Sequence, residues 1–101
     1  MTWTKVASAA ELASQGVFGV TVAGEEIALY WIEGAPYATC NVCTHAFARL
    51  SDGFLDGECI ECPIHQAQFN VKTGEAVAGP ADEPVKTYPC RTESGDIWVD
   101  I

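Results

Sequence analysis

Basic residues are scarce in this sequence, and long apolar runs are missing. Five lysines and arginines stand against fourteen aspartates and glutamates, which gives a formal net charge of −9 over 101 residues. Surfaces that bind nucleic acid or anionic lipid need clustered lysine and arginine, so both kinds of partner are excluded. No apolar run approaches the ~20 residues of a membrane span, and the first residues lack the basic and apolar regions of a signal peptide. We therefore expect a cytoplasmic protein that binds neither nucleic acid nor membrane.

Helical patterns are also rare. Hydrophobic residues make up 49 % of the chain, which is typical of a globular protein, and the length fits one domain over residues 1–101. Only Ser8–Ser14 has a helical pattern, with Ser8 and Glu11 spaced as a capping box and Gly16 placed to end the helix.

Short β-rich segments and turn signals alternate along the rest of the chain. The strands expected from this pattern are 17–22, 27–32, 37–39, 69–71, 75–78, 89–93 and 97–99. Several short strands with frequent turns favour antiparallel sheets over parallel ones. We predict an all-β fold, a small sandwich or barrel, with at most one short helix near the N-terminus.

Two short segments hold both histidines of the chain, each beside a cysteine. The first reads Cys43-Thr44-His45 and the second reads Cys62-Pro63-Ile64-His65. In each segment the cysteine and the histidine are two or three residues apart, so one tight loop can present both. Two thiolates and two imidazoles suit a Rieske 2Fe–2S centre, in which two histidines replace two cysteines on one iron. The predicted ligands of one such cluster are Cys43, His45, Cys62 and His65.

The same region contains a rival pattern of four cysteines. Cys40-x2-Cys43 and Cys59-x2-Cys62 are separated by fifteen residues, which fits a structural zinc site. That site would leave both histidines unexplained, and zinc ribbons commonly carry basic surfaces that this chain lacks. A zinc-binding interaction module therefore stays a remote alternative. The cysteines outside the predicted ligand set, which we expect to be free thiols, are Cys40, Cys59 and Cys90.

Taken together, these residues resemble a Rieske-type ferredoxin, in particular the ferredoxin component of bacterial aromatic-ring-hydroxylating dioxygenases of the naphthalene type. The two Cys/His segments carry the resemblance, with Leu50–Gly53, Phe69 and Thr73–Glu75, and it extends over essentially the whole chain. It implies a Rieske fold of three antiparallel sheets, with two cluster-binding loops at one end and a cluster-binding subdomain at about residues 40–80. It also implies that the two cysteines hold the inner iron and the two histidines the outer iron.

The resemblance implies a soluble one-electron carrier rather than an enzyme. Such ferredoxins take electrons from an NADH-dependent flavoprotein ferredoxin reductase and deliver them to the terminal ring-hydroxylating oxygenase. With both histidines committed as ligands, none is left for general acid–base catalysis. We expect this carrier to be a monomer. The alternative within the family is a Rieske-type small subunit of a larger oxidoreductase, such as an assimilatory nitrite reductase.

The two loops depart from those of the respiratory branch of the family. The additional disulfide of that branch would fall at Ala48 and Ile64, and its hydroxyl donors would fall at Ala67 and Phe69. Without these donors, the extra negative charge of the reduced cluster is less stabilised. We therefore expect a potential toward the low end of the Rieske range of about −150 to +300 mV. A third departure is Gln66, where Rieske motifs commonly place Gly.

Overall fold

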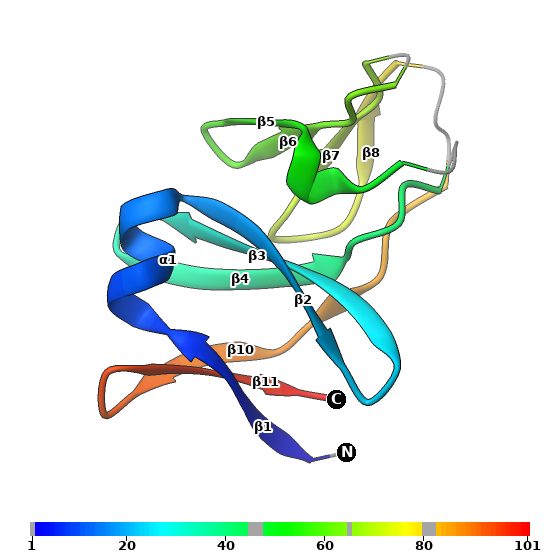
Figure 1. Cartoon of the computed structure of the whole chain (residues 1–101). Coiled ribbons are helices and arrows are strands. Elements are labelled where there is room, and N and C mark those ends of the chain that lie inside the picture. Colours follow the sequence, from blue (N-terminus) through cyan, green and yellow to red (C-terminus); the bar gives the residue numbers. More distant parts are fainter. Residues whose placement is uncertain (1, 45–47, 65, 80–82) are drawn as a thin grey trace.

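The computed structural model describes residues 2–44, 48–64, 66–79 and 83–101. In these ranges the chain forms three antiparallel sheets, one α-helix and one short 3-10 helix, η1 (Leu50–Asp52). The third sheet lies at the top of Figure 1, the first sheet lies at the bottom, and the second sheet runs between them. No sheet closes on itself into a barrel in this part of the chain.

Within the described residues, the three sheets contain three, four and four strands. In order of pairing, the first sheet is β1 (Trp3–Ser8), β11 (Asp96–Asp100) and β10 (Cys90–Glu93). The second is β2 (Val17–Val22), β3 (Glu25–Ile32), β4 (Ala35–Cys40) and β9 (Thr87–Tyr88). The third is β5 (Phe54–Asp56), β6 (Cys59–Glu61), β7 (Gln68–Asn70) and β8 (Ala76–Ala78).

The prediction of an antiparallel, mostly β fold is confirmed, and the strand expected at 17–22 coincides with β2. The other expected strands are present with ends shifted by one or two residues. Four strands have no counterpart in the sequence-based prediction: β1, β5, β6 and β9. Three of these are only two or three residues long, too short for an alternating pattern to stand out.

The helix α1 (Ala9–Gln15) follows β1 and has the predicted cap. The Ser8 hydroxyl accepts a hydrogen bond from the Glu11 N–H at 3.1 Å, and the N–H of Gly16 donates to the Leu12 carbonyl at 2.7 Å. Leu12 is fully buried and fixes the helix against the sheets. No helix within the described ranges is long and apolar enough to cross a membrane.

Strand β3 separates two hydrophobic cores. Alternate residues of a strand point to opposite faces of its sheet. Ala28 and Tyr30 therefore face one core, which also contains Cys43 and Cys62 and is called the loop-side core. On the other face, side chains of β3 such as Leu29 join the helix-side core, together with Leu12 and residues of β11. Burial on both faces explains why β3 reads as one continuous apolar run.

Removal of the helix cap tests this local account of α1. Ser8→Ala deletes the oxygen that satisfies the Glu11 N–H, and the free energy of unfolding should fall by about 1 kcal/mol. Ser8→Thr keeps a hydroxyl and is the matched control. Both values follow from equilibrium urea denaturation. An alanine variant as stable as the threonine variant would contradict the capping role.

Candidate metal centre

The two cysteines predicted as ligands meet at the edge of the loop-side core. Cys43 lies three residues after the end of β4, and Cys62 follows β6 directly. Both side chains are buried, with 4 % and 0 % of their surface exposed. Burial raises the pKa of the Cys62 thiol, a backbone hydrogen bond from Ile64 lowers it, and the neighbouring Cys43 thiol raises it further. Two loops that are distant in sequence therefore place their thiols beside each other. His45 and His65 lie outside the described residues.

The base of the first loop is formed by a short ladder of backbone pairs between its two ends. The N–H of Cys43 donates to the Ala48 carbonyl at 2.9 Å, and Val42 and Arg49 form an antiparallel bridge just below it. The segments on the two sides of the first loop are thus paired, and Cys43 belongs to the last described pair. Ala48 packs against the loop-side core, so the position predicted for half of the missing disulfide is filled by backbone pairing and apolar contact.

The second loop closes in the same way and carries a strained residue. The N–H of Cys62 donates to the Ala67 carbonyl at 2.7 Å. Gln66 has a φ of 59°, a left-handed conformation that costs a residue with a Cβ on the order of 1 kcal/mol. This is the position where Rieske motifs commonly place Gly. The departure noted in the sequence therefore keeps the backbone conformation that glycine favours.

A segment after β8 lies against the second loop at Gly79. A Cβ at this position would lie 2.6 Å from the Ala67 Cα and 2.9 Å from the Gln66 carbonyl oxygen. Backbone cannot yield at such distances, so only glycine fits there. The first loop is joined to a later part of the chain as well, because the Thr44 hydroxyl donates to the Glu83 carbonyl at 2.9 Å. Both predicted ligand loops are therefore supported by the chain that runs from β8 toward β9.

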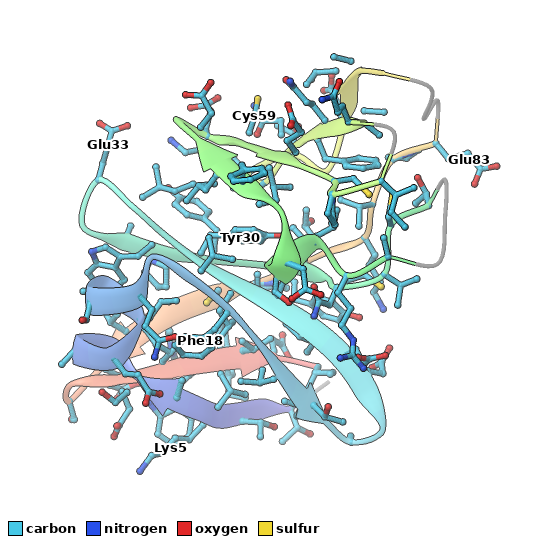
Figure 2. The ribbon with its side chains drawn as sticks, turned by 45° about the horizontal axis from the view of Figure 1, so that its top comes forward. Lys5, Phe18, Tyr30, Glu33, Cys59 and Glu83 are labelled. Carbon is cyan, nitrogen blue, oxygen red and sulfur yellow. The ribbon has the colours of Figure 1, made fainter. Side chains whose placement is uncertain are left out.

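The four cysteines of the zinc alternative do not converge. Among the described residues, which include all five cysteines, no group of three or more His, Cys, Asp and Glu side chains could hold a metal ion. Cys40 lies at the end of β4 and contacts both hydrophobic cores. Cys59 belongs to β6 and points outward from the third sheet, away from Tyr30 in the core (Figure 2). The zinc interpretation is therefore wrong.

Carboxylates line the third sheet. Glu61 accepts a hydrogen bond from the Gln68 amide at 3.1 Å, directly before Cys62. Glu58 is held by the Asn70 amide at 2.9 Å and by the Lys72 ammonium at 3.4 Å. The hydrogen bond from Asn70, followed by that from Lys72, lowers the pKa of Glu58. Negative charge is thus fixed on the sheet that carries the second loop.

The described part of the site fits an iron–sulfur cluster. Thiolates are the soft anionic ligands that such clusters require, and the metal takes the place of the thiol proton. The Ile64 backbone hydrogen bond favours a charged Cys62 sulfur, and the surrounding core side chains exclude water. The members of this core include Leu50, Ile60, Ala67 and Phe69, each fully buried.

Sequence reasoning missed the residues that support the loops. The motif gives Thr44 no role beyond separating two ligands, although its hydroxyl joins separate parts of the chain. Asn41, a buried amide directly before the first loop, belongs to no motif. Only its position in the sequence could have indicated such a role. A polar residue between a strand and a predicted ligand is a candidate for fixing the turn through side-chain hydrogen bonds.

Comparison with known proteins agrees with this geometry. The family model of the Rieske [2Fe-2S] domain matches residues 2–89. The ferredoxin component of a naphthalene 1,2-dioxygenase system from Pseudomonas aeruginosa is 48 % identical over 99 residues, which cover 98 % of this chain and 95 % of that protein. A ferredoxin from Sphingomonas yanoikuyae B1 has a TM-score of 0.92 and 35 % identity, with 99 % of both chains covered.

A second solved structure comes from an assembly. It is a complex of reduced oxygenase and oxidized ferredoxin in carbazole 1,9a-dioxygenase, and one of its chains has a TM-score of 0.89 and 36 % identity. The alignment covers 96 % of the present chain and 91 % of that chain. Family model, sequence and structure agree. The chain therefore belongs to the Rieske [2Fe-2S] family, among the ferredoxin components of dioxygenase systems.

Proposed function

We propose that this protein carries single electrons from an NADH-dependent flavoprotein ferredoxin reductase to the terminal oxygenase of an aromatic-ring-hydroxylating dioxygenase. The observation that supports this most is the similarity over nearly the full chain to ferredoxin components of such systems. The likeness to a chain from an oxygenase–ferredoxin complex supports the oxygenase as electron acceptor. As a member of this group, the protein is an electron carrier rather than an enzyme and has a Rieske-type 2Fe–2S cluster as its cofactor.

Two thiols and two imidazoles are proposed to hold the cluster. Cys43 and Cys62 would bind one iron, a role supported by their burial and mutual proximity. His45 and His65 would bind the other, a role supported by their spacing from the cysteines. We further propose that residues 1–101 act as one Rieske domain, with about 40–80 as the cluster-binding part, and as a cytoplasmic monomer.

The residues around the two thiols set the electrostatic conditions for electron transfer. When bound, the cluster supplies one-electron redox chemistry. Two neutral imidazoles in place of two thiolates remove about two negative charges, which makes it easier to add an electron. Ala67 and Phe69 are fully buried in the loop-side core and offer no hydroxyl. The extra charge is therefore stabilised by backbone groups such as the Ile64 N–H, and the potential should lie toward the low end of the family range.

The net charge of −9 affects the rate at which this protein associates with its partners. Fixed carboxylates on the third sheet, Glu58 and Glu61 among them, attract a protein with a positive surface. Electrostatic attraction of this kind raises association rates and is screened by salt. Both the reductase and the oxygenase are therefore expected to present basic residues to this carrier.

The central test combines cluster content with electron transfer. Purified protein should contain iron and labile sulfide, show a Rieske-type electron paramagnetic resonance (EPR) spectrum after dithionite reduction, and be reduced by NADH with catalytic flavoprotein reductase. Alanine at any of the four proposed ligands should abolish the spectrum, whereas Cys59→Ala should retain it, because Cys59 points away from the site. A cluster-containing protein that no such reductase reduces would contradict the shuttle role. Elution from a sizing column only within a larger complex would favour a permanent subunit.

A hydroxyl added at Phe69 tests the account of the potential. Phe69→Tyr restores a donor in the enclosed site and should raise the midpoint potential on the order of 60 mV, equivalent to about 1.4 kcal/mol for one electron. Phe54→Tyr is the matched control, because it adds the same hydroxyl to the third sheet where the side chain is 70 % exposed. Protein-film voltammetry gives both values. Equal potentials in the two variants would refute the assignment.

A further inference from the structure

We infer that Asn41 is a positioning residue, whose side chain fixes the base of the first cluster-binding loop and thereby the geometry of the bound cluster. The inference rests on the proposed ligand set. Asn41 lies two residues before Cys43 and is 3 % exposed. Its hydrogen bonds go to Glu26, Leu50 and Ser51, so it acts on Cys43 through the paired backbone at the base of the loop.

All the polar groups of Asn41 are paired. Its backbone N–H donates to the Glu26 carbonyl at 2.9 Å, and its carbonyl accepts from the Leu50 N–H at 2.8 Å. Its side-chain Oδ1 accepts from the Ser51 N–H at 2.8 Å, and its Nδ2 donates to the Ser51 Oγ at 2.9 Å. The two backbone bonds join the loop to β3 and η1. Both side-chain bonds go to one residue of η1, Ser51.

These bonds form the lowest of three successive rungs. Above Asn41 and Leu50 come the bridge between Val42 and Arg49 and the bond from Cys43 to Ala48. The middle rung is exposed, since Val42 is 38 % accessible and Arg49 lies on the surface in an ion pair with Glu26. The buried lowest rung is therefore the one that ties the loop to the sheet beneath it.

Strand β2 leaves a space shaped for this side chain. Gly19 stands in the middle of β2, where glycine weakens a strand and marks a close approach. A Cβ at Gly19 would lie 2.7 Å from the Asn41 Nδ2 and 3.1 Å from the Ser51 Oγ. The amide is thus confined between β2 and η1, and its two contacts to Ser51 are its partners there. The close approach of β2 and the two bonds to Ser51 together fix the position of the Asn41 amide.

Release of the lowest rung should loosen the loop without removing any ligand. The side-chain pairing contributes on the order of 1.4 kcal/mol, a factor of about ten in the population of opened loops. Chelator-driven loss of the cluster should therefore be about tenfold faster in Asn41→Leu than in the wild type. A spread of loop conformations should also broaden the EPR lines of the reduced protein.

Thr39→Val is the matched control. Thr39 is fully buried on β4, two residues before Asn41; its hydroxyl donates to the Cys40 carbonyl at 2.9 Å and shares a 2.9 Å hydrogen bond with that of Tyr30. The substitution removes two side-chain hydrogen bonds, as Asn41→Leu does, and neither of them joins the two sides of the ladder. Rates of cluster loss are compared at the same interval below the melting temperature of each variant. Faster loss and broader lines in Asn41→Leu alone support positioning; equal changes in both variants show a merely structural role and overturn it.

Two milder variants keep the test decisive if Asn41→Leu does not fold. Ser51→Ala removes the acceptor of the Asn41 Nδ2, and Ser51→Thr retains it. Gly19→Ala displaces the amide without removing any hydrogen-bonding atom. Ser51→Ala and Gly19→Ala should both show faster cluster loss and broader lines, and Ser51→Thr should match the wild type. Unchanged behaviour in the first two would overturn the inference, whereas a wild type without any cluster would refute the proposed ligand set first.

Discussion

The structure depends on holding two thiols side by side when no disulfide links the loops that carry them. Each cysteine is fixed by one backbone bond across its own loop, from Cys43 to Ala48 and from Cys62 to Ala67. A loop closed by one such bond is weak alone, since each bond contributes about 1 kcal/mol. The supporting contacts therefore come from elsewhere in the chain: the Thr44 hydroxyl, the close approach of Gly79 and the anchored base of the first loop.

The doubly buried β3 carries this arrangement into the rest of the molecule. One of its faces packs against the core that contains both cysteines, and the other packs against α1 and the first sheet. A strand covered on both sides cannot shift by one residue without exposing one of its apolar sets. Its register therefore fixes β4 in turn, and β4 leads into the first loop. The packing of side chains on β3 therefore sets the position of the first loop at the metal centre.

Most of the antiparallel strands and the proximity of Cys43 and Cys62 could be predicted from the sequence, because the strands and the two Cys/His segments are local patterns. The helix cap at Ser8 involves a partner only three residues away. Strand β3 is indicated by its continuous apolar run. The supports of the site could not be predicted this way. Thr44 meets Glu83 across thirty-nine positions, and nothing near Gly79 indicates that Ala67 will lie against it. Contacts of that kind appear only once the sheets are assembled.

The chain balances two opposing electrostatic demands. Its acidic surface favours association with basic partners over a long range, yet negative charge near the cluster opposes the addition of an electron. Burial separates the two effects in part, because Cys62 is fully enclosed while the Glu58 carboxylate lies on the exposed part of the third sheet, where the Lys72 ammonium offsets part of its charge. The apolar side chains of Ala67 and Phe69 then leave backbone N–H groups to stabilise the reduced state. Because its reduced state is only weakly stabilised, such a carrier has a low midpoint potential and can readily pass its electron to an acceptor.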